Sequence, residues 1–206
     1  MRLDRPHLHA LILPLLLCGG CASYLTPASY LGHYGIRNPQ VAQFEVCTSA
    51  GCRRTETTGY STEEWAAVES IFSPAPADET EERERIALAI ALMEQIVGEK
   101  TGTGGDLPMN QRRGATGPQL DCIAEAVNTT IALTLIEQKG LLRFHRVGYP
   151  KHRGFLNLTG PHNTATVESL PSGQSYVVDS WFRANGEPPC IVTTEVWVDG
   201  YHPPKD

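Results

Sequence analysis

The stretch Asp121-Cys122-Ile123-Ala124-Glu125-Ala126 opens a strongly apolar helical segment and sets the fold expected around it. Asp121 suits the N-cap position, because its carboxylate can accept hydrogen bonds from backbone N–H groups that lack a partner within the helix. Cys122 then takes the first helical position, where the positive end of the helix dipole favours a thiolate over a thiol. The position predicts a reactive cysteine. A small buried apolar side chain is the alternative that the position alone leaves open.

The residues that follow Cys122 predict a long, largely buried helix. Apolar side chains recur at helical spacing and form one broad face, made of Ile123, Val127, Ile131 and Leu135 and widened by Ala126, Leu133 and Ile136. Gly140 ends the pattern, as a glycine just past a helix C-terminus does. A stiff buried helix of this kind is a common way to hold a thiol nucleophile in place.

Two helices are expected before this segment. Ser61-Thr62-Glu63-Glu64 forms a capping box, and the helix that it opens ends before Pro74. Asp78 or Thr80 caps the second helix, and Gly98 closes its apolar stripe.

Strands are expected mainly after the cysteine helix. Short runs that alternate or are rich in β-branched residues predict strands at residues 41–47, 141–147, 162–167, 176–182 and 191–198. Residues 149–154 look like a turn. Helices followed by an antiparallel meander indicate an α+β fold.

The N-terminus resembles a bacterial lipoprotein signal peptide over residues 1–20. Two arginines precede the apolar run Leu8–Leu17, which is too short to span a bilayer as a helix. We expect Cys21 to carry the lipid, with ordinary signal cleavage near Ala22 as the alternative. No Asp follows Cys21, which by this resemblance implies an anchor in the outer membrane facing the periplasm. Residues 21–40 are expected to form a tether, and the domain to span 41–206.

Charge and cysteine spacing limit the partners. The net charge of −6 and the lack of a basic stripe argue against a nucleic acid. Outside the cytoplasm disulfides form readily, and Cys47 and Cys52 enclose a turn-forming sequence, so a local disulfide is expected. Half of a zinc site is the alternative, but no second close pair follows. Cys122 and Cys190 remain, and a bond between these two stays open.

Three residues supply the parts of a thiol site in chain order: Cys122, His162 and Asp179. A nucleophilic thiol needs a base, and the base needs a third group that fixes its tautomer. If Ser169 pairs with Gln174, Asp179 lies opposite Thr164, and His162 is its diagonal neighbour at about 7–8 Å between backbones. An odd-length turn would place the base and the acid on opposite faces of the sheet.

This layout resembles the transglutaminase-like branch of the papain-like thiol enzymes, over roughly residues 118–200. The most specific element is Val177-Val178-Asp179-Ser180-Trp181, and Pro161-His162-Asn163-Thr164 is a weaker match. The resemblance implies N-terminal helices and a core helix packed on an antiparallel sheet, with Cys122 as nucleophile, His162 as base and Asp179 as the orienting acid. Gln119, which precedes the cysteine closely, is a candidate oxyanion donor together with the backbone N–H of Cys122.

The expected function is therefore that of an envelope-anchored cysteine peptidase or acyltransferase. It would cleave or transfer amide bonds through a thioester, on a protein or peptide substrate, with cell-wall peptide as one candidate. Contact with the membrane would come through the N-terminal lipid, and no cofactor or metal is implied. The alternative is a catalytically idle domain of the same fold that binds or scaffolds a partner.

Overall fold

A computed structural model describes residues 25–110, 119–154 and 161–204. The signal peptide and Cys21 lie outside these residues. Among the described residues, no helix combines the length and the apolarity that crossing a bilayer requires. The elements in chain order are α1 (Pro27–His33), β1 (Phe44–Cys47), the short 3-10 turn η1 (Ala50–Cys52), β2 (Thr55–Thr58), α2 (Thr62–Ile71), α3 (Glu79–Thr101), α4 (Cys122–Gln138), β3 (His145–Val147), β4 (Lys151–Arg153), β5 (His162–Ser169), β6 (Ser175–Asp179), β7 (Cys190–Thr193) and α5 (Thr194–Val198). The fold is α+β, as predicted.

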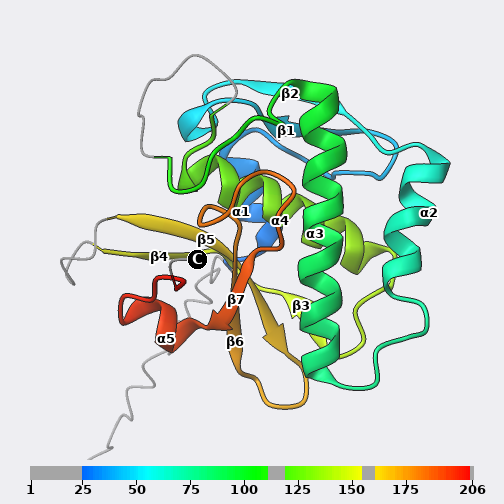
Figure 1. Ribbon diagram of the computed structural model, residues 1–206, viewed down its shortest axis with the longest axis vertical. Helices are drawn as coiled ribbons and strands as arrows, with labels where there is room; N and C mark the ends of the chain where they lie inside the picture. The colour runs from blue at the N-terminus through cyan, green and yellow to red at the C-terminus, as the bar shows by residue number, and fades with distance from the viewer. Residues whose placement is uncertain (1–24, 111–118, 155–160, 205–206) are drawn as a thin grey trace, which may run out of the picture.

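The main sheet is antiparallel and is built around β5. Its strand order is β3-β5-β6-β7, and β4 pairs with the other end of β5, so that β5 has partners along its whole length. β1 and β2 form a separate antiparallel ribbon. Figure 1 shows α4 between this ribbon and the main sheet.

Helix α4 is the centre of the core. Asp121 caps it as predicted, accepting a hydrogen bond from the N–H of Ala124 at 3.0 Å. Five apolar side chains of the predicted face are at most 1 % exposed: Val127, Ile131, Leu133, Leu135 and Ile136. Each such burial is worth about 1.5–3 kcal/mol, so tertiary packing holds the helix in place.

The two helices before α4 are confirmed, with one shift in a boundary. Ser61 and Glu64 form the predicted capping box of α2, and Asp78 caps α3. Gly98 does not close α3, which continues to Thr101. Instead Gly98 lets the following loop approach, because a Cβ there would lie 2.8 Å from the Cα of Gly104.

The described part of the expected tether 21–40, residues 25–40, is not an irregular tether. Thr26 and Ser29 form a capping box that opens α1, and Leu31 and Ile36 are buried at 2 % and 1 % exposure. The segment carries no sustained apolar period, but two anchoring side chains packed with the main core suffice to hold a short helix.

Two segments near the site take a different form from the expected one. Residues 151–153, which resembled a turn, form β4 on the edge of β5. The strand expected over 191–198 stops at Thr193, whose hydroxyl accepts from the N–H of Val196 and opens α5. A capping side chain inside a β-branched run therefore outweighs its strand propensity.

Candidate active site

The three residues of the predicted site lie at the ends of their elements. Cys122 is the first residue of α4, His162 the first of β5 and Asp179 the last of β6. Ser169 donates to the carbonyl of Gln174, and the ladder continues to Ala165 opposite Val178. This is the even register predicted from the sequence.

His162 and Asp179 meet directly across this ladder. Nε2 of the imidazole lies 2.7 Å from Oδ2 of the carboxylate, and the two residues are only 3 % and 1 % exposed. The same Oδ2 accepts a second hydrogen bond, also at 2.7 Å, from Nε1 of Trp197 on α5. Two donors on one oxygen fix the carboxylate, and the carboxylate in turn fixes the imidazole.

An aromatic box surrounds the His162 ring. Its centroid lies 4.5 Å from that of Trp181, 5.2 Å from that of Phe182 and 5.3 Å from that of Trp197. Packing on three sides restricts rotation of the imidazole and keeps water away from its hydrogen bond to Asp179.

The remaining imidazole nitrogen is available to the thiol. Nδ1 of His162 is buried and has no hydrogen-bond partner among the described residues. Burial disfavours the imidazolium, but the hydrogen bond to Asp179 and the interaction with the Cys122 thiol outweigh it, and the pKa of His162 is raised. Asp179 therefore occupies one nitrogen and supports positive charge, while the other nitrogen has no hydrogen-bond partner among the described residues that would prevent it from accepting a proton.

A buried arginine holds α5 against the site. Arg153 lies directly opposite His162 in the β4–β5 ladder and is 4 % exposed. Its guanidinium donates to the carbonyls of Trp197 and Tyr201 and lies 4.4 Å from the Trp197 ring centroid. Arg153 thus keeps the indole in place to donate to Asp179.

Asn163 is a site residue that sequence reasoning did not select. Its Nδ2 lies 3.8 Å from the Sγ of Cys122, and its Oδ1 lies 3.1 Å from Nδ1 of His152. One signal could have indicated Asn163: it is a polar residue next to the predicted base in a strand that is largely buried.

Gln119, the candidate oxyanion donor, has its amide engaged by the neighbouring loop. Its Nε2 donates to the carbonyl of Gly105 at 2.8 Å, and its Oε1 accepts from the N–H of Leu107 and from Asn110. Gln119 precedes the helix, so it lies on the connection, where backbone groups of the neighbouring loop need partners. Its amide fastens this loop to the start of α4.

The cysteines separate into one bonded pair and two free thiols. Cys47 and Cys52 form the expected disulfide, with their Cα atoms 4.8 Å apart, so the zinc alternative for this pair does not apply. Cys122 and Cys190 are both free, and Cys122 is partly exposed. The turn inside the disulfide also serves the site, since Gly51 donates its N–H to Asp121 at 2.8 Å.

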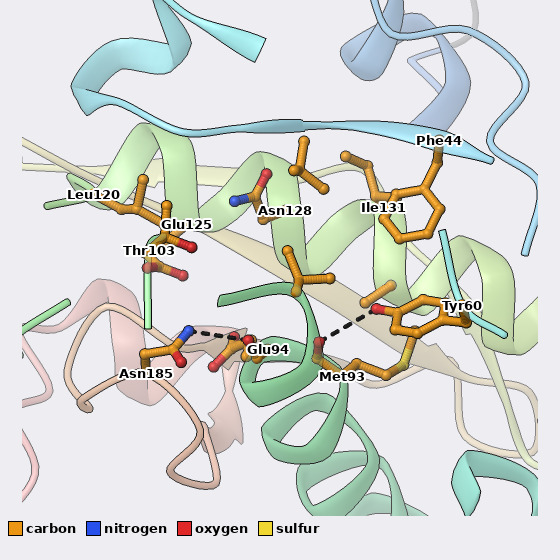
Figure 2. Close-up of a pocket in the computed structure, with 13 residues that line it drawn as sticks. Phe44, Tyr60, Met93, Glu94, Thr103, Leu120, Glu125, Asn128, Ile131 and Asn185 are labelled. Atoms are coloured by element: carbon orange, nitrogen blue, oxygen red, sulfur yellow. Dashed lines mark hydrogen bonds between the residues drawn. The ribbon is translucent and has the colours of Figure 1, made fainter. Parts of the chain in front are cut away.

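Three carboxyl side chains, two of them buried, form a group between α3, α4 and the loop that joins them. Glu94, Asp106 and Glu125 interact with one another, and Asp106 shares a hydrogen bond with Glu125. Figure 2 shows Glu94 on α3 and Glu125 on α4 facing a small pocket. Its volume of about 30 Å³ holds a water molecule or two and is too small for a peptide.

Burial and mutual repulsion keep these carboxyls protonated at unusually high pH. The pKa of Glu94 is raised to about 7, that of Asp106 to about 6, and that of Glu125 well above the ordinary value. The folded state holds these protons more tightly than the unfolded chain. Their contribution to stability is therefore greatest at low pH and falls as the pH rises from about 4, the ordinary carboxyl value, through the folded-state values.

Replacing Glu125 by Gln should remove part of this pH dependence. The introduced amide keeps a donor for Asp106 but cannot ionise, so we expect the melting temperature at pH 8 to rise by a few °C and the difference between pH 5 and pH 8 to shrink. Thermal unfolding followed by circular dichroism measures both. Glu84→Gln makes the same change at a position of α3 outside this carboxyl group and should leave the profile unaltered. An equal shift in both variants would contradict this assignment.

Within the described residues, no group of His, Cys, Asp and Glu has the arrangement of a metal site. The constellation instead has the parts of a thiol nucleophile: Cys122 at a helix start, a buried imidazole beside it, and a carboxylate behind the imidazole. No protein-family model, no curated protein and no solved structure matches the chain.

Proposed function

We propose that this chain is a thiol enzyme of the transglutaminase-like type, which cleaves or transfers amide bonds through a thioester. One observation carries the proposal: Asp179 occupies Nε2 of His162, while the buried Nδ1 has no partner among the described residues and the thiol of Cys122 helps to raise the pKa of the ring. A merely structural histidine would satisfy both nitrogens.

The reaction follows from these positions. His162 takes the thiol proton at Nδ1, and the Cys122 sulfur attacks the amide carbonyl carbon, whose π electrons move to oxygen. When the C–O double bond re-forms, the C–N bond breaks, and the imidazolium protonates the departing amine. Water or an amine then attacks the thioester carbonyl carbon while His162 takes its proton. The C–S bond breaks, the acyl group leaves as a carboxylic acid or a new amide, and the imidazolium returns the proton to the Cys122 sulfur.

The N-terminal sequence supports an envelope location for this activity. A lipid on Cys21 would hold the domain at the outer membrane, facing the periplasm. Water is the abundant acceptor there, so hydrolysis is favoured over crosslinking. We propose a protein or peptide substrate, with cell-wall peptide as one candidate.

Alkylation of Cys122 by iodoacetamide, measured against pH, tests the activated thiol. In the wild type we expect the midpoint at least about one pH unit below the free-thiol value of about 8.5. In His162→Ala the midpoint should return to that value, because the base that supports the thiolate is gone. Mass spectrometry assigns the modified residue, since Cys190 is also free.

The control for this experiment is His33→Ala, which removes an exposed histidine of α1 and should alkylate as the wild type does. An activated thiol justifies a screen of peptide amides, with Cys122→Ala as the inactive reference. A wild-type midpoint at the free-thiol value would overturn the proposal. The alternative function, a catalytically idle domain that binds a partner, would then remain.

A further inference from the structure

We propose that Asn163 stabilises the negative charge on the Cys122 sulfur, and that His152 is its positioning residue. This inference rests on the proposed function and deepens it, because it adds a second polar group to the nucleophile. Asn163 touches the reacting atom, whereas His152 acts through Asn163.

The first observation is the contact between the amide and the sulfur. Nδ2 of Asn163 lies 3.8 Å from the Sγ of Cys122, within hydrogen-bond range for sulfur. Asn163 and Cys122 are both only partly exposed, so their contact is partly shielded from water. An N–H donor to an anion gains more than a donor to a neutral group, and it therefore favours the thiolate over the thiol.

The second observation is a contact with the exposed His152 that favours one orientation of the amide. His152 lies directly opposite Asn163 in the β4–β5 ladder, and its Nδ1 lies 3.1 Å from Oδ1 of the amide. With Nδ1–H donating to Oδ1, the amide must turn its NH2 group toward Cys122. The reverse orientation would place the carbonyl oxygen against a thiolate, which is repulsive. His152 therefore decides which end of Asn163 the sulfur meets.

The two partners of Cys122 have separate tasks in this arrangement. His162 exchanges a proton with the thiol, and its positive charge balances the thiolate. Asn163 exchanges no proton, so its N–H remains a donor throughout the reaction. After the sulfur attacks, the carbonyl oxygen is separated from it by one carbon atom. The same N–H is then a candidate donor to the developing oxyanion, whereas the Gln119 amide donates to the carbonyl of Gly105.

The test is the pH midpoint of Cys122 alkylation in variants of both residues. Asn163→Ala should raise the midpoint by about one pH unit, as expected for the loss of one hydrogen bond to a charged group. Asn163→Asp should raise it further, because a carboxylate repels the thiolate. His152→Ala should raise it by less than Asn163→Ala, because the amide remains but is free to turn.

The double variant separates a positioning role from a general effect on structure. If His152 acts through Asn163, His152→Ala adds nothing once Asn163 is replaced by Ala, and the double variant has the midpoint of Asn163→Ala alone. Additive shifts would overturn the role of His152. Lys151→Ala removes an exposed charge from the same strand and should leave the midpoint unchanged. Circular dichroism checks that each variant is folded.

The outcomes distinguish this inference from the proposed function. A wild type with a lowered midpoint and peptide turnover, together with an unshifted Asn163→Ala, would overturn the role of Asn163 alone. A wild type without a lowered midpoint would overturn the proposed function itself. With a substrate in hand, Asn163→Ala should also lower kcat about 100-fold, the usual cost of losing an oxyanion donor.

Discussion

Replacing Asp179 by Asn is expected to lower kcat/KM on an amide substrate by about 10³–10⁴-fold, the loss that the same change causes in serine triads. Oδ2 of Asp179 accepts from both His162 and Trp197. Asparagine carries no negative charge, and it has one acceptor oxygen and one NH2 group in place of two acceptor oxygens. When the NH2 group takes the place of Oδ2, it faces Nε2 of His162.

The consequence is a change of tautomer. Nε2 would then have to accept, and the proton of a neutral imidazole would move to Nδ1, the nitrogen that is left for Cys122. A nitrogen that already carries a proton cannot take one from the thiol. Steady-state kinetics measure the loss, and alkylation of Cys122 should slow in parallel.

Asp199→Asn is the matched control, because Asp199 is an exposed carboxylate at the end of α5 and follows Trp197 closely in the sequence. Its kinetics should equal those of the wild type. A fully active Asp179→Asn would mean that the carboxylate contributes packing alone, and the assignment of His162 as a base would then lose its main support.

Replacing Glu82 by Ala is expected to cost the most stability, about 3–5 kcal/mol. Glu82 on α3 is fully buried and accepts from the backbone N–H groups of Arg143, Phe144 and His145 at 2.7–3.0 Å. It also pairs with the His145 ring at 2.9 Å. Without the carboxylate, three N–H groups and a ring nitrogen lose their partner at the start of β3.

The measurement is unfolding in urea, in which the midpoint should fall while the slope stays constant. The melting temperature should fall by about 10 °C for a domain of this size. Glu84→Ala truncates a glutamate of the same helix that is not fully buried and should change stability by less than about 0.5 kcal/mol. A Glu82→Ala variant as stable as Glu84→Ala would show that water replaces the carboxylate at little cost.

The part of the site that could be predicted depends on local rules. A cap before an apolar helical face places Asp121 and Cys122, and the two-residue period of strands places His162 and Asp179 on one face once the turn is even. Each rule needs only a short stretch of sequence, and the geometry agrees with both.

The parts that were missed depend on distant partners. Trp197 and Arg153 matter because α5 folds back onto the end of β6, and no local pattern indicates that approach. The short separation between Gln119 and Cys122 in the sequence predicts an oxyanion donor, whereas loop backbone groups decide the contacts of the Gln119 amide. The contact between Asn163 and His152 exists because residues 151–153 form β4 beside β5, whereas their basic sequence predicts a turn.

The indole on α5 also bears on when, under the proposed function, the Cys122 thiol becomes active. A chain made from its N-terminus contains the whole of α4, with Cys122, well before it contains Trp197. Until α5 docks, the Asp179 carboxylate lacks one of its two donors and the aromatic wall of His162 is open on one side. Under the proposed function, a nascent chain would thus carry an unactivated thiol until α5 docks, and only then gain a working Cys122–His162 pair.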